Sequence, residues 1–330
     1  MNQSPWDADA VRRRLLSALL QELSPESWVV EEVHFPKHGS YSAGVDRQFV
    51  RSLGKVRNCQ LGIALTFTTA RWAVPVNWRL IMPDSWGRDW ERRSRARVPD
   101  DELPRPYWQY QIEALDHMAL EWGLPMAPLV VDTTSRGGGE ALLAALDLRH
   151  QPYLVQAGPK LEVCYDQASA ARGSSAPPGG GTAPWHGTVA DLAMKAGNLP
   201  RETVEWCARG DITVRRSQFV ALPVTGGTKP TPGARTPGAP RTLLAEWPLG
   251  RSRPKNFWIT NMTEQTIPRL VELAKLRELV GPRLEDFAER FGLRDYEGRT
   301  FTGWHHHVTL ASAAHTYAVL EELRSADGTG

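Results

Sequence analysis

The order in which strand-like and helical runs follow one another constrains the fold of this chain most. Runs of alternating or continuous apolar residues, typical of strands, are separated by segments with helical periodicity. Strands are expected to start at Trp28 and to cover residues 58–68, 74–81, 128–132 and 153–155, and helices to cover residues 108–122 and 140–148. Three strands followed by alternating helices and strands predict an α/β fold with a mixed sheet.

The two ends of the chain are expected to be helical. Residues 7–23 place apolar side chains on one helical face, with Asp7 as the N-cap and Pro25 beyond the end. The strand that starts at Trp28 is expected to carry Glu31 and Glu32 at its end. From residue 268 onward the pattern is helical again, although Gly281-Pro282 is expected to break the helix there.

Segments rich in Gly, Pro, Ser and Ala interrupt the pattern at residues 168–182 and 225–240. Such compositions are typical of mobile loops or linkers. Short strand-like runs lie between them, so a β-rich insertion is expected. These changes in composition and pattern divide the chain into a first part of the core (1–160), the β-rich insertion (161–255) and a C-terminal helical part of the core (256–330).

Composition and charge narrow the class of protein. The chain of 330 residues is 41% hydrophobic and 23% charged, which is enough to build a sizeable core. A formal net charge of +2 means that any contact with nucleic acid must come from local patches. Cys59, Cys164 and Cys207 form no CxxC pair, which disfavours a zinc ribbon and a disulfide framework. Without a signal-like start or a membrane-length apolar run, we expect a cytoplasmic protein with no membrane partner.

Several short phrases occur in an order that is typical of one family. They are Pro-Trp-Asp at residues 5–7, FPKHGS at 35–40, GVDRQF at 44–49, LGKVRNCQLG at 53–62, LIMPDSW at 80–86, YEGR at 296–299 and GWHHHVTL at 303–310. Taken together, the chain resembles the bacterial insertion-sequence transposases of the DDE superfamily.

The resemblance implies an RNase H-like mixed sheet flanked by helices, with a β-rich insertion. It also implies Mg²⁺ or Mn²⁺ as cofactor, cleavage and transfer of DNA strands, a DNA partner and a homodimer. The family usually begins with a further helical region that helps to bind transposon ends, and we expect this sequence to lack it. The basic residues that the resemblance assigns to DNA contact are Lys37, Arg47, Lys55, Arg277 and Arg299.

The family's metal ligands are Asp, Asp and Glu, because strand transfer needs two ions about 3.5–4 Å apart and Mg²⁺ prefers oxygen ligands. Glu31 or Glu32 occupies the place of the first aspartate, and Asp132 that of the second, after an apolar strand. An ungapped match puts Gly281 at the third position, but Glu285 lies about one helical turn further on. The resemblance thus assigns catalysis to Glu31, Glu32, Asp132 and Glu285, with Glu31, Asp132 and Glu285 binding metal.

Other interpretations of these residues stay open. Glu31 and Glu32 also suit a solvated strand end, and Asp132 suits a cap of the turn after its strand. The chain is therefore either an active DDE transposase or a decayed or repurposed relative that binds DNA or a protein. A third alternative, other enzyme chemistry in the same cleft, predicts a small-molecule pocket beside Asp132.

Two further clusters invite a functional interpretation. Three adjacent histidines, at residues 305–307, cannot all face one metal ion from a helix or strand, so a structural role or DNA contact is expected. The basic runs 12–14 and 88–97, the second including Trp90, suit either phosphate contact or a solvated charged face.

Overall fold

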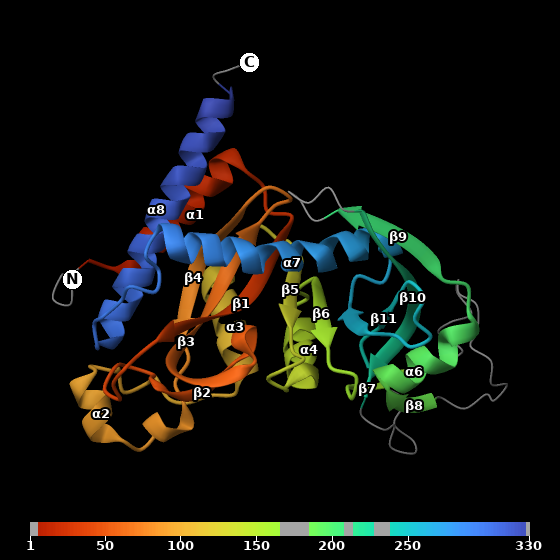
Figure 1. The fold of residues 1–330 in the computed structure, drawn as a ribbon, viewed down its shortest axis with the longest axis horizontal. Coiled ribbons are helices and arrows are strands. Elements are labelled where there is room, and N and C mark those ends of the chain that lie inside the picture. Colours follow the sequence, from red (N-terminus) through yellow and green to blue (C-terminus); the bar gives the residue numbers. More distant parts are fainter. Residues whose placement is uncertain (1–5, 166–184, 208–213, 228–237, 328–330) are drawn as a thin grey trace. The chain divides into compact units, whose positions relative to one another are not determined.

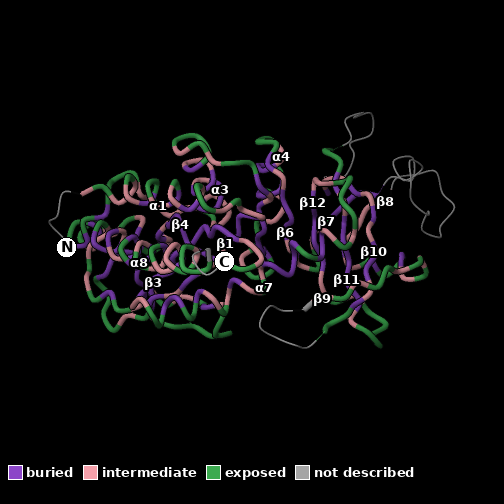
Figure 2. Tube along the Cα trace, turned by 90° about the horizontal axis from the view of Figure 1, so that it is seen from above, coloured by how far each residue is buried: buried purple, intermediate pink, exposed green. Residues whose placement is uncertain are grey.

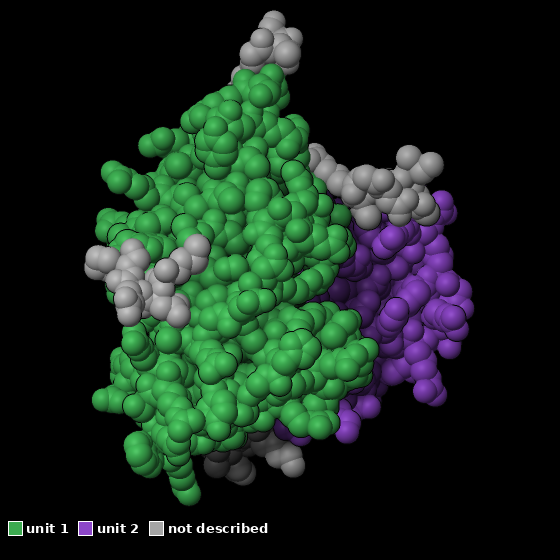
Figure 3. Space-filling model, turned by 60° about the vertical axis from the view of Figure 1, so that its left-hand side comes forward, with its two compact units in different colours: residues 1–125, 279–330 green, residues 126–278 purple. Residues whose placement is uncertain are grey.

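The computed structural model describes residues 6–165, 185–207, 214–227 and 238–327 of the chain. These residues form two compact units, which Figure 3 distinguishes by colour. Unit 1 comprises Met1–Pro125 and Leu279–Gly330, and unit 2 comprises Met126–Glu278. The sequence predicts a core built from both ends of the chain with divisions at residues 160 and 255, whereas the two compact units divide after Pro125 and after Glu278.

Unit 1 is built on an antiparallel sheet whose longest strand is β3 (Lys55–Thr68). This strand pairs with β1 (Ser27–Pro36), β2 (Asp46–Val50) and β4 (Ala73–Leu80) (Figure 1). In the antiparallel pairing of β1 with β3, Ser27 lies opposite Thr68 at one end and Pro36 lies opposite Cys59 at the other. The strand that starts at Trp28 thus continues past Glu31 and Glu32, and the expectation that these glutamates end it is wrong.

Helices cover both faces of this sheet. Asn77 and Trp78 are neighbours on β4, so their side chains point to opposite faces. Trp78 Nε1 donates to Ser312 Oγ of α8 (Phe301–Asp327) at 2.9 Å, and Asn77 Nδ2 donates to the Ala114 carbonyl of α3 (Tyr107–His117) at 3.2 Å. The other elements are α1 (Ala8–Glu22), α2 (Trp90–Arg95), the 3-10 turns Arg51–Leu53 and Asp84–Trp86, and the π-helical turn Met118–Trp122.

Local signals explain the ends of α1 well. The Asp7 side chain accepts a hydrogen bond from the Asp9 amide, which confirms the predicted N-cap.

The helix α7 (Ile267–Arg290) continues through Pro282, where the sequence predicts a helix end. The predicted break at Gly281-Pro282 is wrong: a proline removes one backbone hydrogen bond, to the carbonyl of Glu278, and packing of the helix tolerates that loss.

Unit 2 contains a mixed sheet. β5 (Leu129–Asp132) and β6 (Tyr153–Ala157) are parallel and are joined through α4 (Gly139–Leu148). The sheet continues from β6 through β12 (Asn256–Thr260), β11 (Arg241–Pro248), β10 (Val214–Gly226), β7 (Glu162–Tyr165) and β8 (Trp185–Thr188), with β9 (Glu202–Cys207) on β10. α6 (Val189–Lys195) and the 3-10 turn Ala196–Asn198 follow β8. In Figure 2 the buried residues follow the strands of each unit.

These features confirm the predicted α/β, RNase H-like fold with a mixed sheet flanked by helices. Strands β7 to β11 lie in the segment where the sequence predicts a β-rich insertion. The predicted loop at 168–182 lies outside the described residues, as do residues 228–237 of the second one; Thr225 and Gly226 belong to β10. None of the helices in the described part of the chain combines the length and the hydropathy of a membrane span.

A cluster of aromatic rings fixes α8 on the sheet of unit 1. The Trp304 ring lies 5.4 Å from that of Phe35 and 6.3 Å from that of Trp78, and all three side chains are fully buried. Gly62 of β3 makes room for this contact: a Cβ there would lie 2.8 Å from Trp304 Cζ2. The glycine is thus required by packing rather than by backbone conformation.

We expect Gly62→Ala to destabilise the protein by about 1–3 kcal/mol, the usual cost of overpacking a filled core. Unfolding in urea measures the change. Gly39→Ala is the matched control, since no atom lies within 4 Å of the Cβ it would add. Equal stabilities of the two variants would contradict the close packing of Trp304 on β3.

Candidate nucleic-acid interface and carboxylate positions

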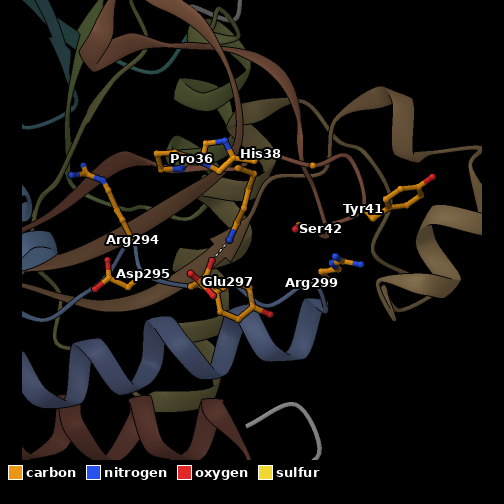
Figure 4. A pocket seen from close by; sticks show the side chains of 11 residues that line it. Pro36, His38, Tyr41, Ser42, Arg294, Asp295, Glu297 and Arg299 are labelled. Atoms are coloured by element: carbon orange, nitrogen blue, oxygen red, sulfur yellow. Dashed lines mark hydrogen bonds between the residues drawn. The ribbon is translucent and has the colours of Figure 1, made fainter.

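Two adjoining hollows in unit 1 are lined by basic side chains. The first has a volume of about 580 Å³ and is lined by Pro36, Lys37, His38, Gly39, Tyr41, Ser42, Arg294, Asp295, Tyr296, Glu297 and Arg299. The second, of about 640 Å³, is lined by Lys37, His38, Gly39, Ser40, Arg47, Val56, Arg57 and Asn58. Figure 4 shows the first hollow, with Arg294 and Arg299 on opposite sides of Glu297. We call Lys37, Arg47, Arg57, Arg294 and Arg299 the basic surface.

Hydrogen bonds bring the segments of this surface together. Asn58 Nδ2 donates to the carbonyls of Lys37 and Gly39, at 2.7 and 3.0 Å, and so holds the loop after β1 against β3. The Ala43 amide donates to the carbonyl of Arg299 at 2.9 Å. Three phrases that are far apart in the sequence, at 35–40, 53–62 and 296–299, therefore build a single surface.

Lys37 has a structural role in this surface. Its ammonium group donates to the carbonyl of Tyr296 and lies 4.7 Å from the centre of the Tyr296 ring. Burial lowers the pKa of Lys37, and Glu297 opposes this effect. Lys37 thus holds the C-terminal segment in place as well as adding charge.

Three other charges of the basic surface point to solvent. Arg47, Arg57 and Arg299 are exposed, as is the predicted DNA contact Lys55 at the start of β3. Within the described parts of the chain, no salt bridge joins these four side chains to a carboxylate. Their charges are therefore available to an anionic ligand.

Asp132 lies at the carboxyl end of β5 and is already paired. Its side chain is 2% exposed, and its Oδ2 lies 3.1 Å from Arg277 Nη1. Its Oδ1 accepts hydrogen bonds from the amide and hydroxyl of Thr134, at 2.7 and 2.6 Å. Arg277, predicted to contact DNA, thus neutralises Asp132 and also reaches Gln156 Oε1 at 3.3 Å.

Glu285 has an arginine partner of its own. Both its oxygens accept from Arg294, at 2.6 and 2.7 Å, in a bidentate pair. Arg294 lowers the pKa of Glu285 through this pair, and burial opposes it. Arg294 also donates to the His34 carbonyl at 3.3 Å. Burial, followed by the charge of Arg294, lowers the pKa of His34.

Glu31 and Glu32 cannot both serve one site. Successive residues of a strand point to opposite faces. Glu31 is opposite Ala64, which in turn is opposite Trp78, so Glu31 shares the face of the sheet that carries α8. Glu32 lies on the other face, with His34.

Two of the predicted metal ligands, Asp132 and Glu285, are each paired with an arginine. A two-metal centre needs carboxylate oxygens that are turned toward the ions. Instead, the carboxylate of Asp132 forms a salt bridge with Arg277, and that of Glu285 forms one with Arg294. Each guanidinium supplies the positive charge that Mg²⁺ or Mn²⁺ would otherwise supply, so these pairs would have to open before either ion could bind.

The histidines at 305–307 point in different directions from α8. His305 lies 3.1 Å from buried Arg12, His306 stacks on Trp6 with ring centres 4.1 Å apart, and His307 approaches the Leu293 carbonyl at 2.9 Å. They therefore hold separate parts of unit 1.

The basic runs divide between buried and exposed roles. Arg12 is buried, which removes it from any surface that could contact phosphate. In the run 88–97, Arg92 donates to the Val45 carbonyl at 2.8 Å and Arg93 to that of Pro99 at 2.6 Å, whereas Trp90 is exposed.

Sequence reasoning missed some members of this region. Arg57 lies within the phrase 53–62 and could have been assigned by its place beside Asn58. Arg294 had no such signal, because nothing local in the sequence places it next to Glu285 and His34.

Comparison with known families agrees with this architecture. A family model described as DDE superfamily endonuclease matches residues 1–219, which is more than half of the chain. The chain therefore belongs to the DDE superfamily endonuclease family, a transposase-like group of nucleases that generally use divalent metal ions. Membership of this family indicates a DNA substrate. No curated protein matches the chain.

Proposed function

We propose that this protein is a transposase-derived DNA-binding protein that holds DNA on the basic surface of unit 1 and does not transfer strands. The observation that carries the proposal is the exposure of Arg47, Arg57 and Arg299 around the two adjoining hollows, without salt bridges among the described residues. Arginine forks match phosphate oxygens in geometry and charge.

The charge distribution supports a local phosphate contact. The net charge is only +2, so the chain as a whole attracts DNA weakly. A cluster of exposed arginines on one surface can still neutralise several phosphates and release their counterions. Such contacts fix the position of the backbone without specifying sequence. Binding should therefore weaken steeply as salt increases.

A second candidate function is metal-dependent cleavage and transfer of DNA strands, as in insertion-sequence transposition. It is favoured by the position of Asp132, at the carboxyl end of a strand in a parallel pair. Open α/β sheets carry their ligand sites at this end of the strands. For Mg²⁺ or Mn²⁺ to bind Asp132 and Glu285, with Glu31 or Glu32 as a further ligand, Arg277 and Arg294 would have to release them.

One assay separates the two functions. Purified protein is incubated with supercoiled plasmid and Mg²⁺ or Mn²⁺, beside an Asp132→Ala variant, and binding of a short duplex is measured in low salt. We expect binding without nicking. Nicking that Asp132→Ala abolishes would establish the second function, and absence of both nicking and binding would refute both. Light scattering of the same sample tests the predicted homodimer.

A further inference from the structure

A second group of ligand-type side chains lies elsewhere in unit 1, between the start of α1 and the end of α3. His117 Nε2 is 3.2 Å from Asp9 Oδ1 and 3.4 Å from Glu121 Oε2. One ligand atom from each of the three residues lies within 4.8 Å of the others. His117 and Glu121 are four residues apart along α3 and its π-helical continuation, so they share a helical face.

The two separations from His117 Nε2 match the coordination sphere of a small transition-metal ion. Zn²⁺ binds imidazole nitrogen and carboxylate oxygen at about 2.0–2.1 Å in a tetrahedron, which places neighbouring ligand atoms about 3.3 Å apart. The distances from His117 Nε2 to Asp9 and Glu121 are 3.2 and 3.4 Å. Two carboxylates would also balance the charge of a divalent ion.

The surroundings hold the ligands in place and leave one side open. The side chain of His117 is 16% exposed and that of Asp9 35%, whereas that of Glu121 is 64% exposed, so an ion can reach it from solvent. Trp122 Nε1 donates to Asp9 Oδ2 at 3.2 Å, so the second oxygen of this carboxylate has a partner that orients the first. The Trp122 ring also lies 5.2 Å from that of His117. Partners of this kind are typical of metal ligands in proteins.

We propose that Asp9, His117 and Glu121 bind a divalent transition-metal ion, with Zn²⁺ as the best match and water as the fourth ligand. The ion joins the first turn of α1 to the end of α3, and its role is to stabilise unit 1. This site shares no residue with the basic surface or with the carboxylates Glu31, Asp132 and Glu285. Because imidazole is a poor ligand for Mg²⁺, the site should discriminate against it.

The test uses untagged full-length protein freed of metal with EDTA. Co²⁺ serves as a spectroscopic probe, because its visible absorption reports tetrahedral coordination, and Zn²⁺ binding is measured by calorimetry. We expect one ion per chain, a higher Tm with Zn²⁺ and no comparable effect of Mg²⁺. His117→Gln should weaken Zn²⁺ binding at least 100-fold, and Trp122→Phe about 10-fold, as for other residues that orient ligands.

Two variants keep the result interpretable. Glu121→Gln changes an exposed side chain, so it should weaken Zn²⁺ while leaving the fold intact by circular dichroism. His186→Gln is the matched control, since His186 also faces a carboxylate, Glu162 at 3.7 Å, and belongs to no three-residue group of ligands among the described residues. Failure of the EDTA-treated chain to bind Zn²⁺ or Co²⁺, or equal affinities of wild type and Glu121→Gln, would overturn the proposal and leave three side chains joined only by ion pairs.

Discussion

Arg12→Ala is expected to lower the free energy of unfolding by about 3 kcal/mol. The variant loses both the packing of the buried side chain and the hydrogen bonds that its charged guanidinium donates. The guanidinium donates to Thr309 Oγ1 at 2.7 Å and to the carbonyls of Trp78 and His305, each at 3.2 Å. It is 4% exposed, and burial lowers the pKa of Arg12 to about 9. The single side chain thus links α1, β4 and α8.

Denaturant unfolding of Arg12→Ala beside Arg14→Ala measures the effect. Arg14 is an exposed residue of the same helix, so its variant should differ from the wild type by less than about 0.5 kcal/mol. A change below about 1 kcal/mol for Arg12→Ala would contradict the prediction. It would mean that the free-energy cost of burying the guanidinium charge offsets the stabilisation that its hydrogen bonds provide.

The double variant Arg47→Gln, Arg57→Gln is expected to weaken DNA binding roughly tenfold in low salt, about 0.7 kcal/mol for each exposed charge that pairs with a phosphate. The slope of log Kd against log salt should also fall by about 2, one for each phosphate that is no longer neutralised. Both side chains line the second hollow and are exposed, so the fold should be unaffected.

Fluorescence anisotropy with a short duplex at several salt concentrations measures both quantities. Arg13→Gln, Arg14→Gln removes the same charge from the exposed side of α1 and is the matched control. If the two double variants lose affinity equally, net charge rather than the basic surface determines binding. If the Arg47→Gln, Arg57→Gln variant keeps the affinity of the wild type, DNA binds outside the basic surface.

The sequence predicted those parts of the fold that local rules determine. Asp7 begins α1 because its side chain caps the helix, and the apolar run before Asp132 forms β5. The phrases quoted for the family resemblance also identified Lys37, Arg47 and Arg299, which line the hollows. In each case the residues concerned are close in sequence or belong to a known pattern.

The parts that were missed depend on tertiary contacts. Pairing of Arg277 with Asp132 joins residues of α7 and β5, and no local rule anticipates it. Likewise β1 continues beyond Glu32 because β3 supplies hydrogen-bond partners along its whole length. Pro282 remains inside α7 although proline is a strong local signal for a helix end. The metal assignment of Glu31, Asp132 and Glu285 stays a prediction.

The assembly of unit 1 from both ends of the chain has a consequence for its synthesis on the ribosome. Unit 2 is a continuous segment, Met126–Glu278, so all of its residues are present as soon as that segment has emerged. The sheet of unit 1 must wait for Trp304 and Thr309, which fill its core and bind Arg12. Synthesis of the chain between Pro125 and Trp304, at about 5–20 residues per second, takes roughly 10–40 s. During it the nascent N-terminal strands expose apolar surface, and this is the period in which chaperone protection would matter most.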